Sequence, residues 1–288
     1  MTWVAIMIAA AFLQAAKDAF LKKAMADVDV VAATWSYCLA TSAVLGIMVL
    51  YAGFPEVGPG FWWLVAVSGA FGAVNLLLYS TAIRASDLSL TLPMLTLSPL
   101  FMLVTSPLMI GEFPDAAGLV GIFLIVAGSY VLNLKLLIHG VFAPFKALLV
   151  HKGPRIMLLV AFLWSLCANI DRMGLNASSP VAWVFCAYAA TTVMLTPLVF
   201  WRSSGVLAQI AKNPRAIAAA GACEAVSVAF QMIALTMTLV PYVIAVKRLS
   251  AVFGVLLGAL VFREKGLSER LAGAALMVAG VFFIALLG

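Results

Sequence analysis

Apolar runs of about 20 residues recur along the whole chain and are separated by short polar turns. As a helix, a run of this length crosses roughly 30 Å of hydrocarbon. Backbone amides in lipid must be hydrogen-bonded within their own segment, so each run is predicted to be a helix. The pattern predicts ten spans, at residues 2–22, 30–51, 60–83, 88–110, 115–134, 155–175, 180–201, 214–238, 240–262 and 268–287.

Residues 82–128 return as residues 234–280, at a constant offset of 152 and without a gap. Each copy contains two apolar runs joined by a short turn with an acid. The matching positions are Leu97-Ser98 with Leu249-Ser250, Phe101 with Phe253, Glu112 with Glu264, Gly121 with Gly273, and 126–128 with 278–280. A duplicated membrane unit makes transport the first functional hypothesis.

The longest connection, residues 135–154, mixes basic residues with Phe142, Phe145 and Leu148. It is predicted to be an amphipathic linker on the membrane surface. It separates five spans (1–134) from five spans (155–288), and an odd number forces the two halves into opposite senses. The predicted fold class is an all-α polytopic membrane protein of ten transmembrane helices in two inverted five-helix repeats.

Composition agrees with this class. The chain is 65% hydrophobic and 10% charged, whereas a soluble domain has about half apolar and a quarter charged residues. The first run is not a signal peptide, because it lacks a basic start and Lys17 and Asp18 stand where a cleavage site would follow. The four cysteines lack metal-ligand spacing and are interpreted as packing residues.

The net charge of +6 reports on loops and not on a nucleic-acid partner. Of the basic residues in and next to the connections, Arg172 alone belongs to the side of the connections after even-numbered spans. The connections after odd-numbered spans carry Lys22, Lys23, Arg84, Lys135, Lys146, Lys152, Arg155, Arg202, Lys212, Arg215, Arg263, Lys265 and Arg270. The positive-inside rule therefore predicts that the odd connections are cytoplasmic and that both termini are outside.

Prolines and glycines add local detail. Pro93, Pro99 and Pro107 are predicted to bend or break the fourth span, because each removes a backbone donor. Pro241 opens the ninth span, where proline costs little. The Gly pairs seven residues apart in the last span of each half are expected to be helix-packing positions.

Ionisable residues interrupt the apolar spans. Lys17 and Asp18 lie late in span 1, Glu224 lies in the middle of span 8, and Lys247 and Arg248 lie about two turns into span 9. Each costs about 2.5–3.5 kcal/mol on insertion scales, so such residues usually serve a pathway or a partner. Two adjacent cations exceed what one Glu neutralises, which suits a carboxylate, a phosphate or a zwitterion. Glu224 is expected to counter them or to exchange a proton.

Helical spacing places other polar residues on shared faces. In span 8, Glu224, Ser227 and Gln231 form one stripe, and span 3 carries a matching stripe that includes Asn75 and Tyr79. These stripes are expected to face one central, water-accessible cavity. The predicted substrate-binding residues are Lys247, Arg248, Glu224, Asn75, Tyr79, Gln231, Ser98, Asn169, Asp18 and Trp164.

Structural interpretations stand beside these functional ones and stay open. Glu224 with Lys247 or Arg248 is also readable as a structural ion pair between helices. Asn75, Ser227 and Ser98 suit interhelical hydrogen bonds. Lys17, Arg172 and Lys135 lie close enough to span ends for their charges to reach the interface. Trp164, Tyr37 and Tyr188 are residue types that usually pack or anchor at the interface.

The chain resembles the drug/metabolite transporter superfamily, specifically EamA-like proteins. The resemblance covers essentially the whole chain and rests on SDLSLTLPMLTLSPLF, GE at 111–112, AVKRLSAVF, RE at 263–264, and G-x6-G at 121–128 and 273–280. It implies a multi-pass carrier of the inner (plasma) membrane that works by alternating access and often exports metabolites such as amino acids. It also implies cytoplasmic termini, contrary to the charge distribution.

The predicted function is secondary transport of a small anionic or zwitterionic metabolite, such as an amino acid. A flippase for a lipid-linked substrate and a non-transporting scaffold are the alternatives. The chain has no HExxH, GxSxG or GxxxxGK[ST] motif, so we predict no enzyme activity, no cofactor and no metal. The predicted partners are the substrate, the lipid bilayer, protons as a coupling ion and a second copy of the chain.

Overall fold

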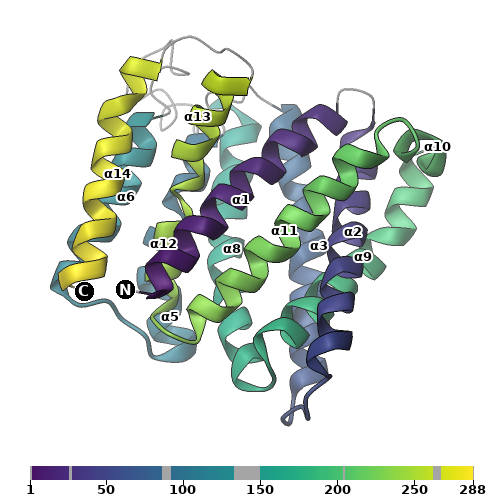
Figure 1. Ribbon diagram of the computed structural model, residues 1–288, viewed down its shortest axis with the longest axis horizontal. Helices are drawn as coiled ribbons and strands as arrows, with labels where there is room; N and C mark the ends of the chain where they lie inside the picture. Colours follow the sequence, from purple (N-terminus) through teal and green to yellow (C-terminus); the bar gives the residue numbers. More distant parts are fainter. Residues whose placement is uncertain are drawn as a thin grey trace.

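The computed structural model describes residues 2–25, 28–85, 92–132, 150–203, 205–261 and 267–287, and within these ranges the helices lie side by side (Figure 1). The first half contains α1 (Thr2–Ala24), α2 (Val30–Ala52), α3 (Phe61–Ala85), the 3-10 helix η1 (Leu92–Leu97), α5 (Ser98–Ile110) and α6 (Ala116–Leu132). The second half contains α8 (Lys152–Asn176), α9 (Pro180–Arg202), α10 (Val206–Ile210), α11 (Pro214–Leu235), α12 (Val240–Lys247), α13 (Ser250–Val261) and α14 (Leu267–Leu287).

The predicted spans correspond to these helices. Seven segments of the described chain are long and apolar enough to cross a membrane. Shorter apolar helices stand at the three other predicted spans, at Met94–Ile110, Ala116–Leu132 and Ala272–Leu286. The predicted all-α polytopic class is confirmed. The predicted linker lies mostly outside the described residues, and its last three residues, 152–154, instead form the start of α8.

The close contact of α6 with α14 shows how the halves are related. A Cβ atom on Gly121 would lie 2.7 Å from the carbonyl oxygen of Gly280, and one on Gly128 would lie 2.6 Å from that of Gly273. The two helices are therefore antiparallel and touch through glycine backbones, which agrees with the prediction that these glycines are helix-packing positions. Gly121 and Gly128 are the repeat counterparts of Gly273 and Gly280, so the contact maps onto itself. A two-fold relation between inverted repeats has this property.

The other large interfaces follow the same relation. At the α2–α9 interface, the hydroxyls of Ser42 and Thr192 lie 3.4 Å apart. Under the repeat, α1 corresponds to α8 and α11 to α3, so the α1–α11 interface is the counterpart of the α8–α3 interface. Ser227 on α11 donates to the Ala10 carbonyl oxygen on α1 (2.8 Å). Each of these interfaces joins one half to the other, so residues buried along them lie between the repeats.

The fourth and ninth spans are both interrupted at the same repeat position. Near Pro99, the 3-10 helix η1 gives way to α5 at Leu97–Ser98, so the predicted break is present there. The predicted span at 240–262 is present and is long and apolar enough over Val240–Leu257 to cross a membrane, but a short turn interrupts its helix. Here α12 ends at Lys247, Arg248 and Leu249 form a turn, and α13 begins at Ser250, the counterpart of Ser98. The amides of Arg248 and Leu249 donate to carbonyls three residues earlier (3.0 Å each), which tightens the turn without a proline.

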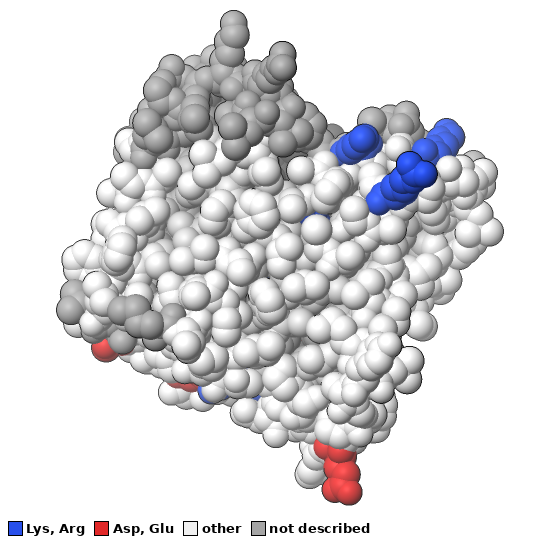
Figure 2. All heavy atoms as spheres, viewed as in Figure 1, with Lys and Arg blue, Asp and Glu red and all other residues white. Residues whose placement is uncertain are grey.

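The termini and the basic residues lie at opposite ends of the bundle. Figure 1 shows both chain ends at the same end of the molecule. In Figure 2, which has the same view, Lys and Arg side chains gather over the other end, where α1 finishes and α11 begins, and acidic side chains lie near the end that holds the termini. The charge separation expected from the sequence is thus present in three dimensions among the described residues.

Candidate functional site

A buried ion cluster lies between α1 and α11. Lys17 Nζ lies 2.7 Å from Asp18 Oδ1 and 3.9 Å from Glu224 Oε2. Lys17 is 8% exposed and Glu224 is 5% exposed, while the Asp18 side chain is 60% exposed. We call Lys17, Asp18, Glu224 and their neighbour Tyr188 the α1–α11 ion cluster. Its single cation faces two carboxylates, so no positive charge is left over.

Hydrogen bonds and rings complete this cluster. The Tyr188 hydroxyl on α9 donates to Glu224 Oε1 (2.6 Å). With its amide oriented to suit both neighbours, Gln14 accepts from Lys17 Nζ (2.7 Å) and donates to Glu224 Oε2 (3.1 Å). Lys17 Nζ also lies 5.6 Å from the centre of the Tyr37 ring on α2. Four helices from both halves therefore hold one ion pair in place.

A second pair of cations lies at the break between α12 and α13 and has different partners. Lys247 donates to the Gln231 side-chain oxygen on α11, and the Arg248 guanidinium donates to the Ser98 hydroxyl at the start of α5. Within the described residues, neither cation forms an ion pair with a carboxylate. We call Lys247 and Arg248 the α12 cation pair. Because their hydrogen-bond partners, Gln231 and Ser98, are neutral, no group in contact with the pair neutralises its positive charge.

Aromatic rings form a wall beside Arg248. Its guanidinium carbon lies 5.9 Å from the centre of the Trp164 ring on α8. Trp164 in turn stacks on Tyr79 of α3, with ring centres 6.0 Å apart and an angle of 26° between the rings. A cation held over an indole face is stabilised by the ring quadrupole, and the flat guanidinium keeps its edge available for a planar anion.

Two buried polar atoms beside this wall have no hydrogen-bond partner among the described residues. They are Arg248 Nε and Asn75 Oδ1. Asn75 uses its amide nitrogen on the Cys167 sulfur (3.5 Å) and is 1% exposed. Unsatisfied buried polar groups are costly, and in native proteins each is explained by strain, by a functional role or by a bound water or ion.

Asn169 has a different environment. Its amide donates to Thr105 (3.0 Å) and to the Ser165 carbonyl oxygen (3.1 Å), and its oxygen accepts from Ser106 (2.8 Å). These bonds tie α8 to α5. Of the predicted site residues, Asn169 is thus engaged in an interhelical network, whereas Ser98, Gln231, Tyr79 and Trp164 surround the α12 cation pair.

The expected contacts of Glu224 and Lys17 require correction. One interpretation of Glu224 was an ion pair with Lys247 or Arg248, but among the described residues the cation in ion-pair contact with it is Lys17 on the adjacent helix α1. Lys17 was expected to extend toward the interface, but it is buried and turned inward. Arg172 forms an ion pair with Glu112 (3.1 Å) and donates to the Leu235 carbonyl oxygen. The corresponding expectation for Lys135 lies outside the described residues.

The predicted substrate-binding residues did not include Lys17, Gln14, Tyr37 and Tyr188. Gln14 and Lys17 are three residues apart and share a helical face, so the spacing held a usable signal for α1. The two tyrosines belong to α2 and α9, and their positions carry no pattern that distinguishes them from packing residues.

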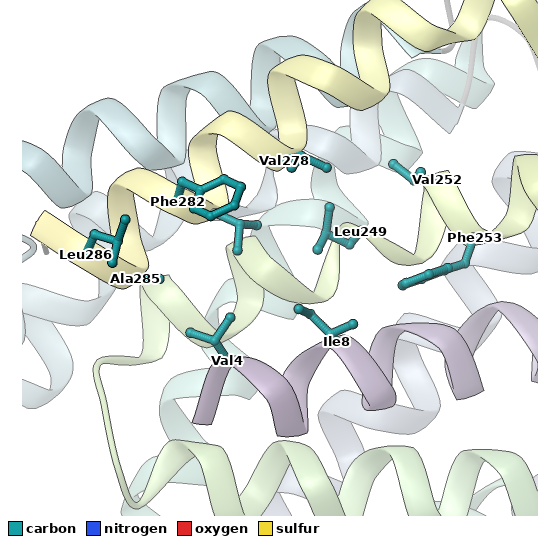
Figure 3. Close-up of a pocket in the computed structure, with 10 residues that line it drawn as sticks. Val4, Ile8, Leu249, Val252, Phe253, Val278, Phe282, Ala285 and Leu286 are labelled. Carbon is teal, nitrogen blue, oxygen red and sulfur yellow. The ribbon is translucent and has the colours of Figure 1, made fainter. Parts of the chain in front are cut away.

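An apolar groove lies on the side of the bundle formed by α1, α13 and α14 (Figure 3). It has a volume of about 340 Å³ and runs between α1, α13 and α14. Its lining contains no polar side chain and none of the predicted site residues: Val4, Ile8, Leu249, Val252, Phe253, Val278, Val281, Phe282, Ala285 and Leu286. One lining residue, Leu249, follows Arg248 in the turn between α12 and α13, so the groove reaches this turn.

Apolar spans arranged as two inverted halves, with buried charges between them, define a polytopic membrane protein with a polar interior. Comparison with known proteins identifies the family. The model of the EamA-like transporter family matches residues 1–134 and 151–286, and the chain belongs to this family. Members transport small substrates through membranes and are generally not enzymes. The chain is a multi-pass membrane transporter whose partners include a small-molecule substrate and membrane lipid.

The fold also matches a solved structure entitled "Crystal structure of protein". The two chains share 19% sequence identity, the match covers 99% of this chain and 98% of the other, and the TM-score is 0.78. This likeness concerns the fold. A comparison with curated proteins finds no significant match to the sequence.

Proposed function

We propose that the chain is a secondary carrier that moves a small anionic or zwitterionic metabolite, such as an amino acid, across the inner membrane by alternating access. The observation that supports this most directly is the α12 cation pair. Lys247 and Arg248 lie within the bundle without a carboxylate partner among the described residues. Because uncompensated buried charge is expensive, an anionic substrate group is the natural counterion.

The neighbouring residues suit the rest of such a substrate. Arg248 Nε and Asn75 Oδ1 are a donor and an acceptor that lack protein partners. A carboxylate would take the donors of Arg248, and a substrate ammonium or hydroxyl group would suit Asn75. Gln231 and Ser98, which now hold the two cations, would release them in exchange for the substrate. Trp164 and Tyr79 would form the flat wall against which the substrate rests.

The inverted repeats support alternating access as the mechanism. Both halves contain a helix break at the same repeat position, Leu97–Ser98 and Leu249–Ser250, next to the proposed site. Discontinuous helices at a repeat interface are where many secondary carriers hold their substrate. We propose Glu224 as the ionisable group for a proton-coupled step. That the chain associates with a second copy of itself stays a prediction.

For orientation, we infer from the charge distribution that the basic end is cytoplasmic and that both termini are outside. The resemblance to EamA-like proteins implies the opposite orientation, with cytoplasmic termini.

Counterflow in proteoliposomes tests the proposal. Vesicles loaded with amino acids, organic acids, nucleosides and sugar phosphates are assayed by mass spectrometry for the compounds that leave. The wild type is compared with Lys247→Gln/Arg248→Gln and with Lys152→Gln/Arg155→Gln, which removes the same charge from exposed positions. We expect one anionic or zwitterionic class to move in the wild type and the control, but not in the first variant. Equal movement of neutral compounds in all three proteins would refute the cationic site.

A flippase for a lipid-linked substrate is the second candidate. The apolar groove between α1, α13 and α14 favours it, since such a function needs a path for acyl chains on the lipid-facing side (Figure 3). Fluorescent lipid translocation in the same vesicles distinguishes the two. Val252→Trp in the groove would block lipid movement but leave exchange of a soluble metabolite unchanged.

A further inference from the structure

A second pocket lies at the basic end of the bundle, where α1 finishes and α11 begins. Its volume is about 540 Å³, and it is lined by Phe20, Lys23, Lys212, Asn213, Pro214, Arg215, Ala216 and Ala219. Lys23 comes from the last turn of α1, Lys212 from the turn before α11, and Arg215 from the first turn of α11. The pocket thus bridges the first half and the second half of the chain.

Three cations surround this one pocket. Lys23, Lys212 and Arg215 are all exposed, and within the described residues their side chains form no ion pair. Figure 2 shows the basic side chains gathered over this end of the molecule. Like charges that converge on one hollow repel one another, and a bound anion relieves that repulsion.

Apart from Asn213, the rest of the lining is apolar, and Phe20, Ala216 and Ala219 lie on the span side of the cations. Phe20 is one turn before Lys23 on α1 and is 40% exposed, and Ala219 is one turn after Arg215 on α11. A free phosphate ion has no apolar group that could pack against these apolar lining residues. A phospholipid has a phosphate for the cations and acyl chains for the apolar helix surfaces below them.

We propose that this pocket binds the headgroup of an anionic phospholipid, with the phosphate among Lys23, Lys212 and Arg215 and the upper part of an acyl chain against Phe20. The lipid holds the ends of α1 and α11 together. These two helices also carry Lys17 and Glu224, so the headgroup stabilises the interface that contains the ion cluster. This inference concerns binding and stands independently of which substrate the protein carries.

The experiment uses the full chain in phosphatidylcholine nanodiscs with and without phosphatidylglycerol. Lipid retention is measured by native mass spectrometry and stability by thermal unfolding. We expect the wild type to retain phosphatidylglycerol in preference to phosphatidylcholine and to unfold at a higher temperature with it. In Lys23→Gln/Lys212→Gln/Arg215→Gln, the affinity should fall by about 100-fold, the effect of removing three cations next to a membrane phosphate.

The matched control is Lys152→Gln/Arg155→Gln/Arg202→Gln, which removes three exposed cations outside the pocket. It should retain phosphatidylglycerol like the wild type. An equal loss in both variants would mean that only the general positive field attracts lipid, and it would overturn the proposal. So would a wild type with no preference between the two lipids. If glycerol phosphate alone in phosphatidylcholine nanodiscs gives the full stabilisation, the ligand is a soluble anion and the lipid assignment is wrong.

Discussion

The α1–α11 ion cluster and the α12 cation pair both bury positive charge between the same two halves, yet they are completed differently. Lys17 has two carboxylates, a glutamine amide and a tyrosine ring around it. Lys247 and Arg248 have one neutral oxygen each, and Arg248 keeps a buried donor without a partner. A charge whose partners are already present contributes to the fold, whereas a charge whose partner is missing is available to a ligand. The following variants test that division.

The largest effect on stability is expected for Lys17→Gln. It leaves Glu224 as a buried carboxylate without its cation, and breaking a buried ion pair in this way costs about 3–5 kcal/mol. Thermal unfolding in detergent should show a strongly lowered midpoint. Lys17→Gln/Glu224→Gln removes both charges and should recover much of the loss. If Lys17→Gln unfolds like the wild type, the ion cluster does not hold the fold together.

Lys247→Gln/Arg248→Gln should show the opposite behaviour. We expect transport to fall by about 100-fold, because removing one partner of a buried charged contact typically costs about 2–5 kcal/mol of binding. The unfolding midpoint should stay the same or rise, since the variant removes uncompensated buried charge. Flux assays and thermal unfolding on the same preparation give both values. A large drop in stability with normal flux per folded molecule would reverse the proposed division.

Trp164→Leu should have a smaller effect. It removes the ring beneath Arg248, a contact worth about 0.5–2 kcal/mol, and therefore weakens substrate binding by about two- to thirty-fold. The effect should appear in KM measured by initial-rate transport. Trp164→Phe retains a ring and should lie between the wild type and Trp164→Leu. Identical KM values for all three proteins would remove Trp164 from the substrate site.

Asp18→Asn should have the smallest effect. Its side chain is 60% exposed although it lies 2.7 Å from Lys17, and exposed ion pairs contribute about 0–1 kcal/mol. Glu224 remains to neutralise Lys17. The unfolding midpoint should move little compared with Lys17→Gln. A loss as large as that of Lys17→Gln would show that Asp18, and not Glu224, is the essential partner.

Much of the fold follows from the sequence. Apolar length predicts the helical spans. The glycine spacing predicts that the last span of each half packs closely against another helix, and the structure shows that α6 and α14 are these partners. The site is predictable only in part. The α12 cation pair and its neighbours Gln231 and Ser98 are identified by their cost in lipid and by helical faces. The ion partner of Glu224 cannot be identified in this way, because a helical face indicates the direction of a side chain but not which helix lies opposite it.

The amino-acid sequence by itself determined the number of spans, the inverted duplication, the end at which basic loops gather and the presence of surplus buried charge. These properties depend on hydrophobic length, repeat register and charge, which are local. Only the tertiary structure decided that Lys17 pairs with Glu224, that Arg248 lies over Trp164, and that α12 ends at Lys247 without a proline. Such contacts arise from packing between residues far apart in the chain, where side-chain shape and the crossing of helices select one neighbour from several that have compatible chemistry.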